Sequence, residues 1–294
     1  MHVFLTGAGG WIGSHTVDEL LAHGHRVTGL ARTPAAADAL AAKGAGALPG
    51  DLDDLDALRR GALAADAVVH LANKHDWANP AESNRAERAA VQTFADALSG
   101  SDRPFLFASG LAALGLDRPA AETDPSPHHG PDSPRGGAEN LALGSAGVHA
   151  IAARFAPTVH GTGDHGFISY LVAAARRTGV SGYVGDGATA WSAVHVRDAA
   201  RLVRLALVQA PAGARLHAVA ETAVLSRDIA TAIGAILDVP VKAVDPAEAV
   251  EHFGFLGRFF GTDMTATSDL TRAAFDWTPT GPALLEDITA GAYA

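Results

Sequence analysis

The sequence predicts a doubly wound α/β fold with a parallel sheet, and three observations support this prediction. Short apolar segments alternate with helix-length amphipathic segments through the first half of the chain. A glycine-rich turn joins the first of these predicted strands to the first predicted helix. The chain has 294 residues, of which 48% are hydrophobic and 18% charged, so it is globular and long enough to bury a large core.

The predicted elements of this sheet follow in chain order. Five apolar runs of strand length are predicted as buried strands: 2–6, 25–30, 66–72, 103–109 and 149–155. Amphipathic segments between them are predicted as helices: 11–24, 37–44, 55–63 and 85–100. A further strand is expected just before Gly50. Regular alternation of this kind places helices on both faces of a parallel sheet.

The second half of the chain is less regular. We predict helices at 168–177 and 226–237, strands at 216–220 and 239–245, and a broken helical tail over 246–294. Residues 116–134 form a long loop rich in proline, aspartate and histidine, and loops of this length inside a compact domain are often functional.

Composition narrows the class of function. A formal net charge of −10 argues against nucleic acid or an anionic membrane as the partner. The absence of cysteine excludes disulfides, thiolate metal sites and cysteine nucleophiles. No apolar run approaches the roughly 18 residues that span a bilayer, and the 14 histidines show no metal-ligand spacing. We therefore expect a cytoplasmic, metal-free protein that acts on a small molecule.

Residues 6–13 read TGAGGWIG and place glycines at Gly7, Gly10 and Gly13. Glycine permits a tight turn, lets the backbone approach a pyrophosphate and allows the helix to pack closely on the strand. Free N–H groups at the helix N-terminus favour the phosphates. The strand–turn–helix context favours dinucleotide binding, with Trp11 and Ile12 in the turn, over a merely structural turn.

Other candidate cofactor residues follow the predicted strands. Arg32 stands where a carboxylate that binds the ribose of NAD would be expected, and a guanidinium can hold a 2′-phosphate instead. We therefore expect NADP(H) in preference to NAD(H), although a solvated loop arginine is the alternative. Asp51 and Leu52 are expected near the adenine, and Leu71 and Ala72 end a strand at the sheet edge that binds ligands.

Several pieces of the sequence match the motifs of a known family in order. They are TGAGGWIG (6–13), GDL (50–52), VVHLA (68–72), FLFASGLAALG (105–115), ARFAPTVHG (153–161), VHVRDAA (194–200) and FDWTP (275–279). On these motifs the sequence resembles the extended short-chain dehydrogenase/reductases, which include sugar-nucleotide epimerases and dehydratases. The resemblance implies a Rossmann domain over 1–160 that also receives about 194–220. It further implies a smaller substrate-capping lobe over 161–193 and 221–294.

The resemblance also locates a reaction site. It places Pro157 beside the cofactor, and it implies a homodimer through the helix that carries the catalytic pair. The family has a hydroxyl residue after the strand matched by FLFAS, and a Tyr-x-x-x-Lys pair in a later helix. Here Gly110 falls at the hydroxyl position beside Ser109, and Arg135 and Glu139 replace the pair. Atypical members with Arg-x-x-x-Glu look most similar.

The Arg135–Glu139 pair changes the expected chemistry. Ser133 and Pro134 predict a helix start, which would place both side chains on one face. An arginine stays protonated at any physiological pH and so cannot act as an acid, but it can polarise a carbonyl oxygen or hold an anionic group. Glu139 could accept hydrogen bonds from the cofactor ribose and orient Arg135. An ordinary surface ion pair is the alternative.

The proton must then come from another group. His75, beside Asp76 in the loop after the fourth strand, is an acid–base candidate, with a solvated loop histidine as the alternative. Ser109 could bind substrate or satisfy the strand end, and His160 could face the cleft. These residues predict an NADP(H)-dependent oxidoreductase of a small carbonyl or alcohol. A cofactor-binding sensor, or an epimerase or dehydratase with transient hydride transfer, is the alternative.

Overall fold

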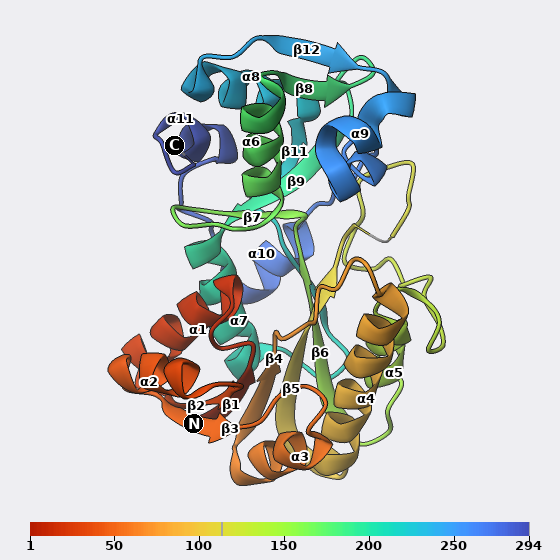
Figure 1. The fold of residues 1–294 in the computed structure, drawn as a ribbon. Coiled ribbons are helices and arrows are strands. Elements are labelled where there is room, and N and C mark those ends of the chain that lie inside the picture. The colour runs from red at the N-terminus through yellow and green to blue at the C-terminus, as the bar shows by residue number, and fades with distance from the viewer. Residues whose placement is uncertain (113, 294) are drawn as a thin grey trace.

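The computed structural model describes residues 1–112 and 114–293 (Figure 1). Its largest sheet has seven parallel strands in the order β10-β6-β5-β4-β1-β2-β3. These strands are β1 (His2–Thr6), β2 (Arg26–Ala31), β3 (Gly46–Pro49), β4 (Ala67–His70), β5 (Ser101–Gly110), β6 (Val148–Phe155) and β10 (Arg215–Ala218). The predicted doubly wound α/β fold is thereby confirmed.

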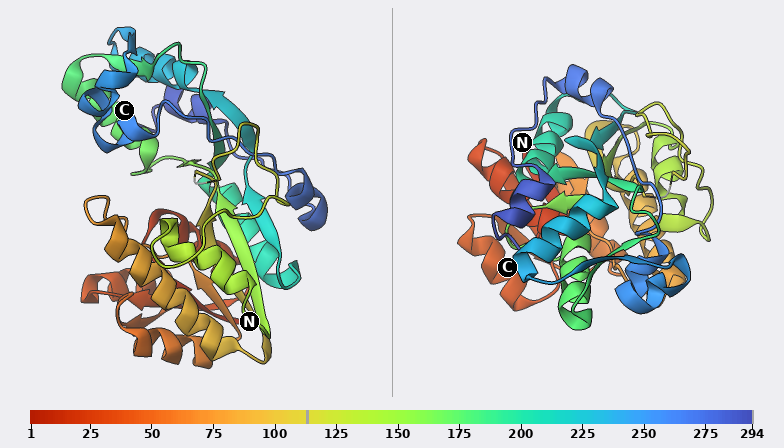
Figure 2. Two further views of the ribbon diagram at one scale, coloured as in Figure 1. Left: turned by 90° about the vertical axis from the view of Figure 1, so that its right-hand side faces the viewer. Right: turned by 90° about the horizontal axis from the view of Figure 1, so that it is seen from above.

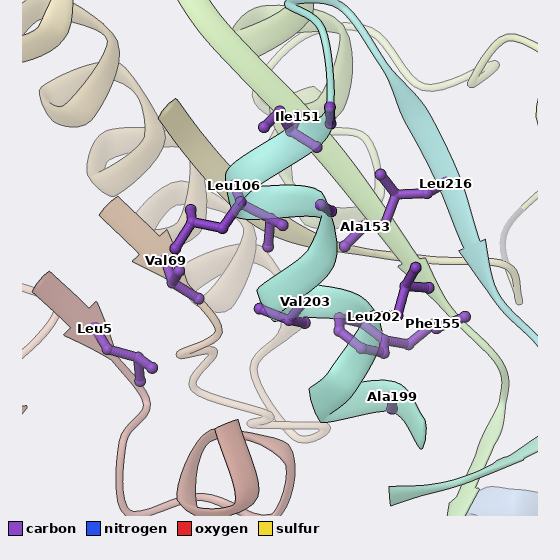
Figure 3. Packing of buried hydrophobic residues seen from close by; sticks show 14 of the residues in the cluster. Leu5, Val69, Leu106, Ile151, Ala153, Phe155, Ala199, Leu202, Val203 and Leu216 are labelled. Carbon is purple, nitrogen blue, oxygen red and sulfur yellow. The ribbon is translucent and has the colours of Figure 1, made fainter. Parts of the chain in front are cut away.

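Helices cover both faces of this sheet, as its apolar strands require. One face carries α1 (Trp11–Ala22), α2 (Pro34–Ala42) and α7 (Val196–Gln209), and the other carries α3 (Leu55–Ala64), α4 (Pro80–Leu98) and α5 (Ala138–Leu143). Side chains alternate between the two cores, so Leu5 packs on the first face and Phe4 on the second. Figure 3 shows α7 packed on the strands through Leu202 and Val203.

A second lobe sits over the end of the sheet (Figure 2). It contains β7 (Thr158–His160), β8 (Ser181–Val184), β9 (Ala190–His195), β11 (Glu221–Leu225) and β12 (Val241–Val244) in two small sheets. Its helices are α6 (Phe167–Thr178), α8 (Ser226–Leu237), α9 (Ala249–Phe253) and α11 (Leu284–Thr289), with short 3-10 helices η2 (Pro246–Glu248) and η3 (Gly254–Arg258). The lobe has its own core, which includes Trp191 and Phe260.

The tail of the chain does not stay in this lobe. Before α11 completes the lobe, α10 (Asp269–Phe275) returns to the large sheet, and Ala266, Phe275 and Trp277 lie in the core on the α7 side. The Trp277 indole N–H donates a hydrogen bond of 3.1 Å to the carbonyl oxygen of Asp198 on α7. The assignment of the whole segment 221–294 to the lobe therefore differs from the observed packing. Within the described residues, no helix is long and apolar enough to cross a membrane.

Candidate active site

The turn after β1 has a geometry that requires glycine. Gly7 has a φ of +76°, and a Cβ atom there would lie 2.7 Å from the backbone nitrogen of Ala72. A Cβ atom on Gly13 would lie 1.9 Å from the Gly7 carbonyl oxygen. The Gly10 N–H donates a 2.9 Å hydrogen bond to the same oxygen and closes the turn. Leu71 and Ala72, directly after β4, thus lie against the turn, at the carboxyl edge of the sheet where the sequence places them.

Helix α1 begins directly after this turn. Gly10 is the N-cap and offers no side chain to the first-turn N–H groups, which leaves them available to an anion. Trp11 connects the turn with the lobe. Its indole N–H donates a 2.8 Å hydrogen bond to the carbonyl oxygen of Val159 on β7. Ile12 packs against the core on the α7 side. These contacts fit a dinucleotide pyrophosphate.

The remaining cofactor candidates lie at the same edge of the sheet, after β2, β3 and β6. Arg32 is exposed and makes no hydrogen bond or ion pair with any residue that the structure describes. One Asp51 carboxylate oxygen accepts backbone hydrogen bonds of 2.9 and 3.1 Å from Asp53 and Asp54. Leu52 is buried, and Pro157 lies between β6 and β7.

The segment around Arg135 is not the helix that Ser133 and Pro134 predict. Arg135, Gly136 and Gly137 have φ values of 53°, 60° and 61°, which form a left-handed turn, and α5 begins only at Ala138. The two glycines adopt this conformation at low cost, and the turn packs so tightly on α4 that a Cβ on Gly136 would lie 2.3 Å from the carbonyl oxygen of Asn84. The prediction that Arg135 and Glu139 share a helix face is therefore wrong.

Arg135 is instead held by α4 and β5. Its guanidinium Nη2 donates hydrogen bonds of 2.7 Å to Glu87 Oε1 and 2.9 Å to the Ala108 carbonyl oxygen. Its backbone N–H donates to the side-chain oxygen of Asn84 at 2.9 Å. The Arg135 side chain remains 29% exposed, whereas that of Glu87 is fully buried. A buried carboxylate thus fixes a partly exposed guanidinium at the carboxyl end of β5.

Glu87 has further partners that the sequence did not indicate. Its Oε2 accepts a 3.0 Å hydrogen bond from the Asn73 side chain and lies 3.9 Å from His70 Nε2. The other ring nitrogen of His70 is 2.6 Å from the Thr6 hydroxyl, at the end of β1. One signal was available: Glu87 lies one turn before Ala90 and Val91, on the apolar face of a predicted helix. A charged residue on such a face needs a buried partner.

Glu139 belongs to a separate, inward-facing cluster. Its carboxylate accepts two hydrogen bonds from Arg154, one of them 3.0 Å from Nε, together with 2.7 Å from the Ser109 hydroxyl and 3.2 Å from Arg215. Burial raises the pKa of Glu139, but the hydrogen bond and charge of Arg154 outweigh it and hold the pKa below its usual value. Four donors occupy the carboxylate, so Glu139 does not orient Arg135, contrary to the sequence prediction. A ribose hydroxyl would have to displace one of them.

This cluster also bears on Ser109. Its hydroxyl points to Glu139 at 2.7 Å, which favours a structural role at the strand end over the alternative of substrate contact. His160 is likewise fully buried, 2.6 Å from Asp287 on α11, and therefore does not face an open cleft.

His75 lies in the loop that follows β4, within the electrostatic influence of Arg135. Desolvation lowers the pKa of His75, and the positive charge of Arg135 lowers it further. Both residues have positive φ, 48° for His75 and 53° for Arg135, whereas the other two such non-glycine residues in the described part of the chain, Asp238 and Asp276, are helix C-caps. Strained backbone of this kind often occurs at functional sites. Asp76 accepts hydrogen bonds from the backbone of the same loop instead of the ring of His75.

Aromatic residues of the lobe meet this loop. The Trp77 ring lies 6.2 Å from His75 and stacks on Phe255 of η3 at 5.2 Å and 18°. Phe167 and Phe259 lie within 6.4 and 6.1 Å of the Trp77 ring. Phe167 of α6 and the η3 segment are thus brought to the loop that carries His75, whereas Trp191 is 1% exposed inside the lobe core.

The strand order, the glycine turn and the open N-terminus of α1 define a dinucleotide-binding α/β protein with a second lobe over its site. The chain belongs to the NAD dependent epimerase/dehydratase family, whose model matches residues 3–219. The predicted resemblance to this class is confirmed at the level of the family.

Two similar proteins match over nearly the whole chain, and a third matches over most of it. Uncharacterized proteins of Schizosaccharomyces pombe and Saccharomyces cerevisiae are each 40% identical, covering 100% and 99% of this chain and 100% and 98% of their own. A ketoreductase of Stigmatella aurantiaca that is named for a farnesyl dihydroquinoline oxide is 28% identical, over 72% of this chain and 66% of its own.

Solved structures show the same fold. MoeE5 in complex with UDP-glucose and NAD matches with a TM-score of 0.75 and 25% identity, over 99% of this chain and 97% of its own. UDP-glucose 4-epimerase of Thermotoga maritima matches with a TM-score of 0.77 and 19% identity, over 100% of this chain and 98% of its own.

Proposed function

We propose that this protein is an NADP(H)-dependent oxidoreductase that interconverts a carbonyl compound and its alcohol. The observation that carries the proposal is the Arg135 guanidinium, fixed by Glu87 and Ala108 at the carboxyl end of β5 with His75 in its electrostatic field. The family membership and the similarity to a ketoreductase both support hydride chemistry on a carbonyl group.

The chain offers a set of groups that fits the dinucleotide. The glycine turn (Gly7, Gly10, Gly13) and the first turn of α1, with Trp11 and Ile12, would hold the pyrophosphate, and exposed Arg32 would bind a 2′-phosphate. Asp51 and Leu52 would contact the adenine, while Leu71, Ala72 and Pro157 would line the nicotinamide side. The bound cofactor supplies the hydride.

In the reductive direction, Arg135 would stabilise the negative charge that develops on the substrate oxygen. Its Nη1 makes no hydrogen bond with any residue the structure describes, and its Nε is buried without a partner. Preorganised donors of this kind lower the barrier, because they gain strength as the oxygen becomes charged. His75, in its protonated form, would then give its proton to that oxygen, and its lowered pKa favours the transfer.

The experiment follows nicotinamide absorbance with a panel of ketones and aldehydes. Arg135→Ala should lose turnover by roughly a hundredfold or more, the size seen when an oxyanion donor is removed, and should still bind NADPH. Arg59→Ala, which removes an exposed arginine from α3, is the matched control. Parent-like activity of Arg135→Ala would remove Arg135 from the mechanism.

A second candidate is an epimerase or dehydratase with transient hydride transfer. The match to MoeE5, solved with UDP-glucose and NAD at 25% identity, favours it. Product analysis after incubation with a sugar nucleotide, without net cofactor consumption, would support this candidate. Silence in both assays with confirmed NADPH binding would point to a sensor. A cytoplasmic homodimer remains a prediction, which sedimentation and fractionation test.

A further inference from the structure

The reacting end of the substrate can be described further if Arg135 and His75 act as proposed above. We infer that the substrate is uncharged next to its reacting carbonyl and carries a ring there, as in an aryl ketone or an aryl keto ester. A 2-oxo acid, whose carboxylate adjoins the carbonyl, is thereby excluded. The inference rests on the charge balance around Arg135 and on the aromatic side chains beside His75.

The charge of Arg135 is already compensated. Glu87 lies 2.7 Å away with a fully buried side chain. A buried carboxylate stays ionised only when a cation or several donors offset its lost hydration, and here Arg135 and Asn73 do so. The Arg135–Glu87 pair is therefore neutral as a unit, and the guanidinium offers hydrogen-bond donors without a net charge.

The neighbouring cations already have partners or are present only as a minor form. Arg88 of α4 donates a 2.8 Å hydrogen bond to the Gly136 carbonyl oxygen, so its guanidinium is engaged by the turn. Desolvation and the charge of Arg135 lower the pKa of His75, so at neutral pH the protonated ring that would act as the acid is the minor form. Lys74 lies between Asp53 at 2.9 Å and Glu82 at 2.8 Å, which leaves that trio with a net negative charge. A substrate carboxylate would lose hydration here without gaining a cation that has no other partner, whereas a neutral carbonyl requires only the unpaired donors of Arg135.

The ring is inferred from the aromatic cluster Trp77, Phe167, Tyr170, Phe255 and Phe259. This cluster begins at Trp77, two residues after His75, and continues through Phe255 to Tyr170, whose ring lies 5.1 Å from that of Phe255. Trp77 and Tyr170 are 44% and 47% exposed. Large exposed aromatic side chains grouped beside a reaction site favour an apolar, ring-bearing ligand. Arg258 lies between Phe255 and Phe259 on η3 and is exposed, so the inference concerns the reacting end of the substrate only.

The test compares two compounds with one skeleton, methyl benzoylformate and benzoylformate, which differ by an ester and a carboxylate beside the ketone. With NADPH, the parent should reduce the ester with a kcat/KM at least about tenfold higher, a modest preference for one compensated charge. Glu87→Gln removes the charge that compensates Arg135. It should therefore lower the ester-to-acid ratio of kcat/KM or reverse the preference. Asp96→Asn, which neutralises an exposed carboxylate on the same helix outside the Lys74 trio, should leave that ratio unchanged.

The contribution of the ring is tested separately. Trp77→Ala should lower kcat/KM for methyl benzoylformate several-fold, with little change for methyl pyruvate, which lacks the ring; a single aromatic contact has about this size. A parent that prefers benzoylformate, or Trp77→Ala that affects both esters equally, would overturn the inference.

A binding measurement separates this inference from the proposed function. Calorimetric titration of the NADP-loaded protein with the two compounds reports affinity without turnover. If no carbonyl compound is reduced, the proposed function fails, and tighter binding of the ester than of the acid still supports the inference, while the reverse order refutes it. Should Glu87→Gln not fold, the comparison in the parent and in Trp77→Ala decides.

Discussion

Replacing Glu139 by alanine would separate a structural role for this residue from the cofactor-binding role that its sequence position suggests. The change removes the partner of Arg154, which is 0% exposed, and also the acceptor of Ser109. Breaking a buried ion pair by removing one partner costs about 3–5 kcal/mol. For large domains each kcal/mol lowers Tm by about 2–4 °C, so we expect a fall on the order of 10 °C.

The assay is thermal unfolding followed by circular dichroism, with calorimetric titration of NADPH on the folded variant. Glu82→Ala is the control, because this half-exposed carboxylate pairs with Lys74 at the surface and its loss should cost at most about 1 kcal/mol. NADPH affinity should be unchanged in Glu139→Ala below its Tm. A variant with the same Tm as the parent, whether or not its NADPH affinity is lower, would refute the structural role.

Four further outcomes are expected. Gly13→Ala should abolish NADPH binding in calorimetry, because its Cβ would lie 1.9 Å from a carbonyl oxygen of the turn, whereas Gly9→Ala, with no atom within 4 Å, should bind normally. Arg32→Glu should weaken NADPH about tenfold or more relative to NADH in the same titration, since a carboxylate repels the 2′-phosphate. The reduction rate should fall as pH rises through the lowered pKa of His75, below 6.5, and His75→Asn should show a low rate without that fall. The lowered pKa of Glu139 contributes stability above about 4.5, so the Tm difference between parent and Glu139→Ala should shrink as pH falls below that value.

The sheet was predictable because its strands are buried on both faces. In β1, Phe4 and Leu5 are both fully buried in opposite cores, so the run is apolar throughout and stands out in the sequence. The glycine turn was predictable for a different reason, since the clash at Gly13 is with Gly7, six residues earlier in the same turn. Local spacing therefore carries this information, although the clash at Gly7 involves Leu71 and Ala72, which lie far along the chain.

The position of Arg135 was not predictable in the same way. Ser133 and Pro134 favour a helix start locally, yet the left-handed turn is fixed by Asn84 and Glu87 on α4, 51 and 48 residues earlier in the chain than Arg135. The pairing of Glu139 with Arg154 also depends on how β6 lies beside α5, which spacing along the chain does not specify. Partners of buried charges are set by tertiary packing, so sequence indicated the residues but not the pairs.

The return of α10 and Trp277 to the core on the α7 side has a consequence for how the protein unfolds. The polypeptide enters the lobe and leaves it more than once, so neither half is an autonomous folding unit. A truncated chain that stops before residue 266 would lack the indole that fills the space beside α7, and its remaining portion would be prone to aggregate. Heating the intact chain in a scanning calorimeter should accordingly produce one cooperative peak, with both halves melting together.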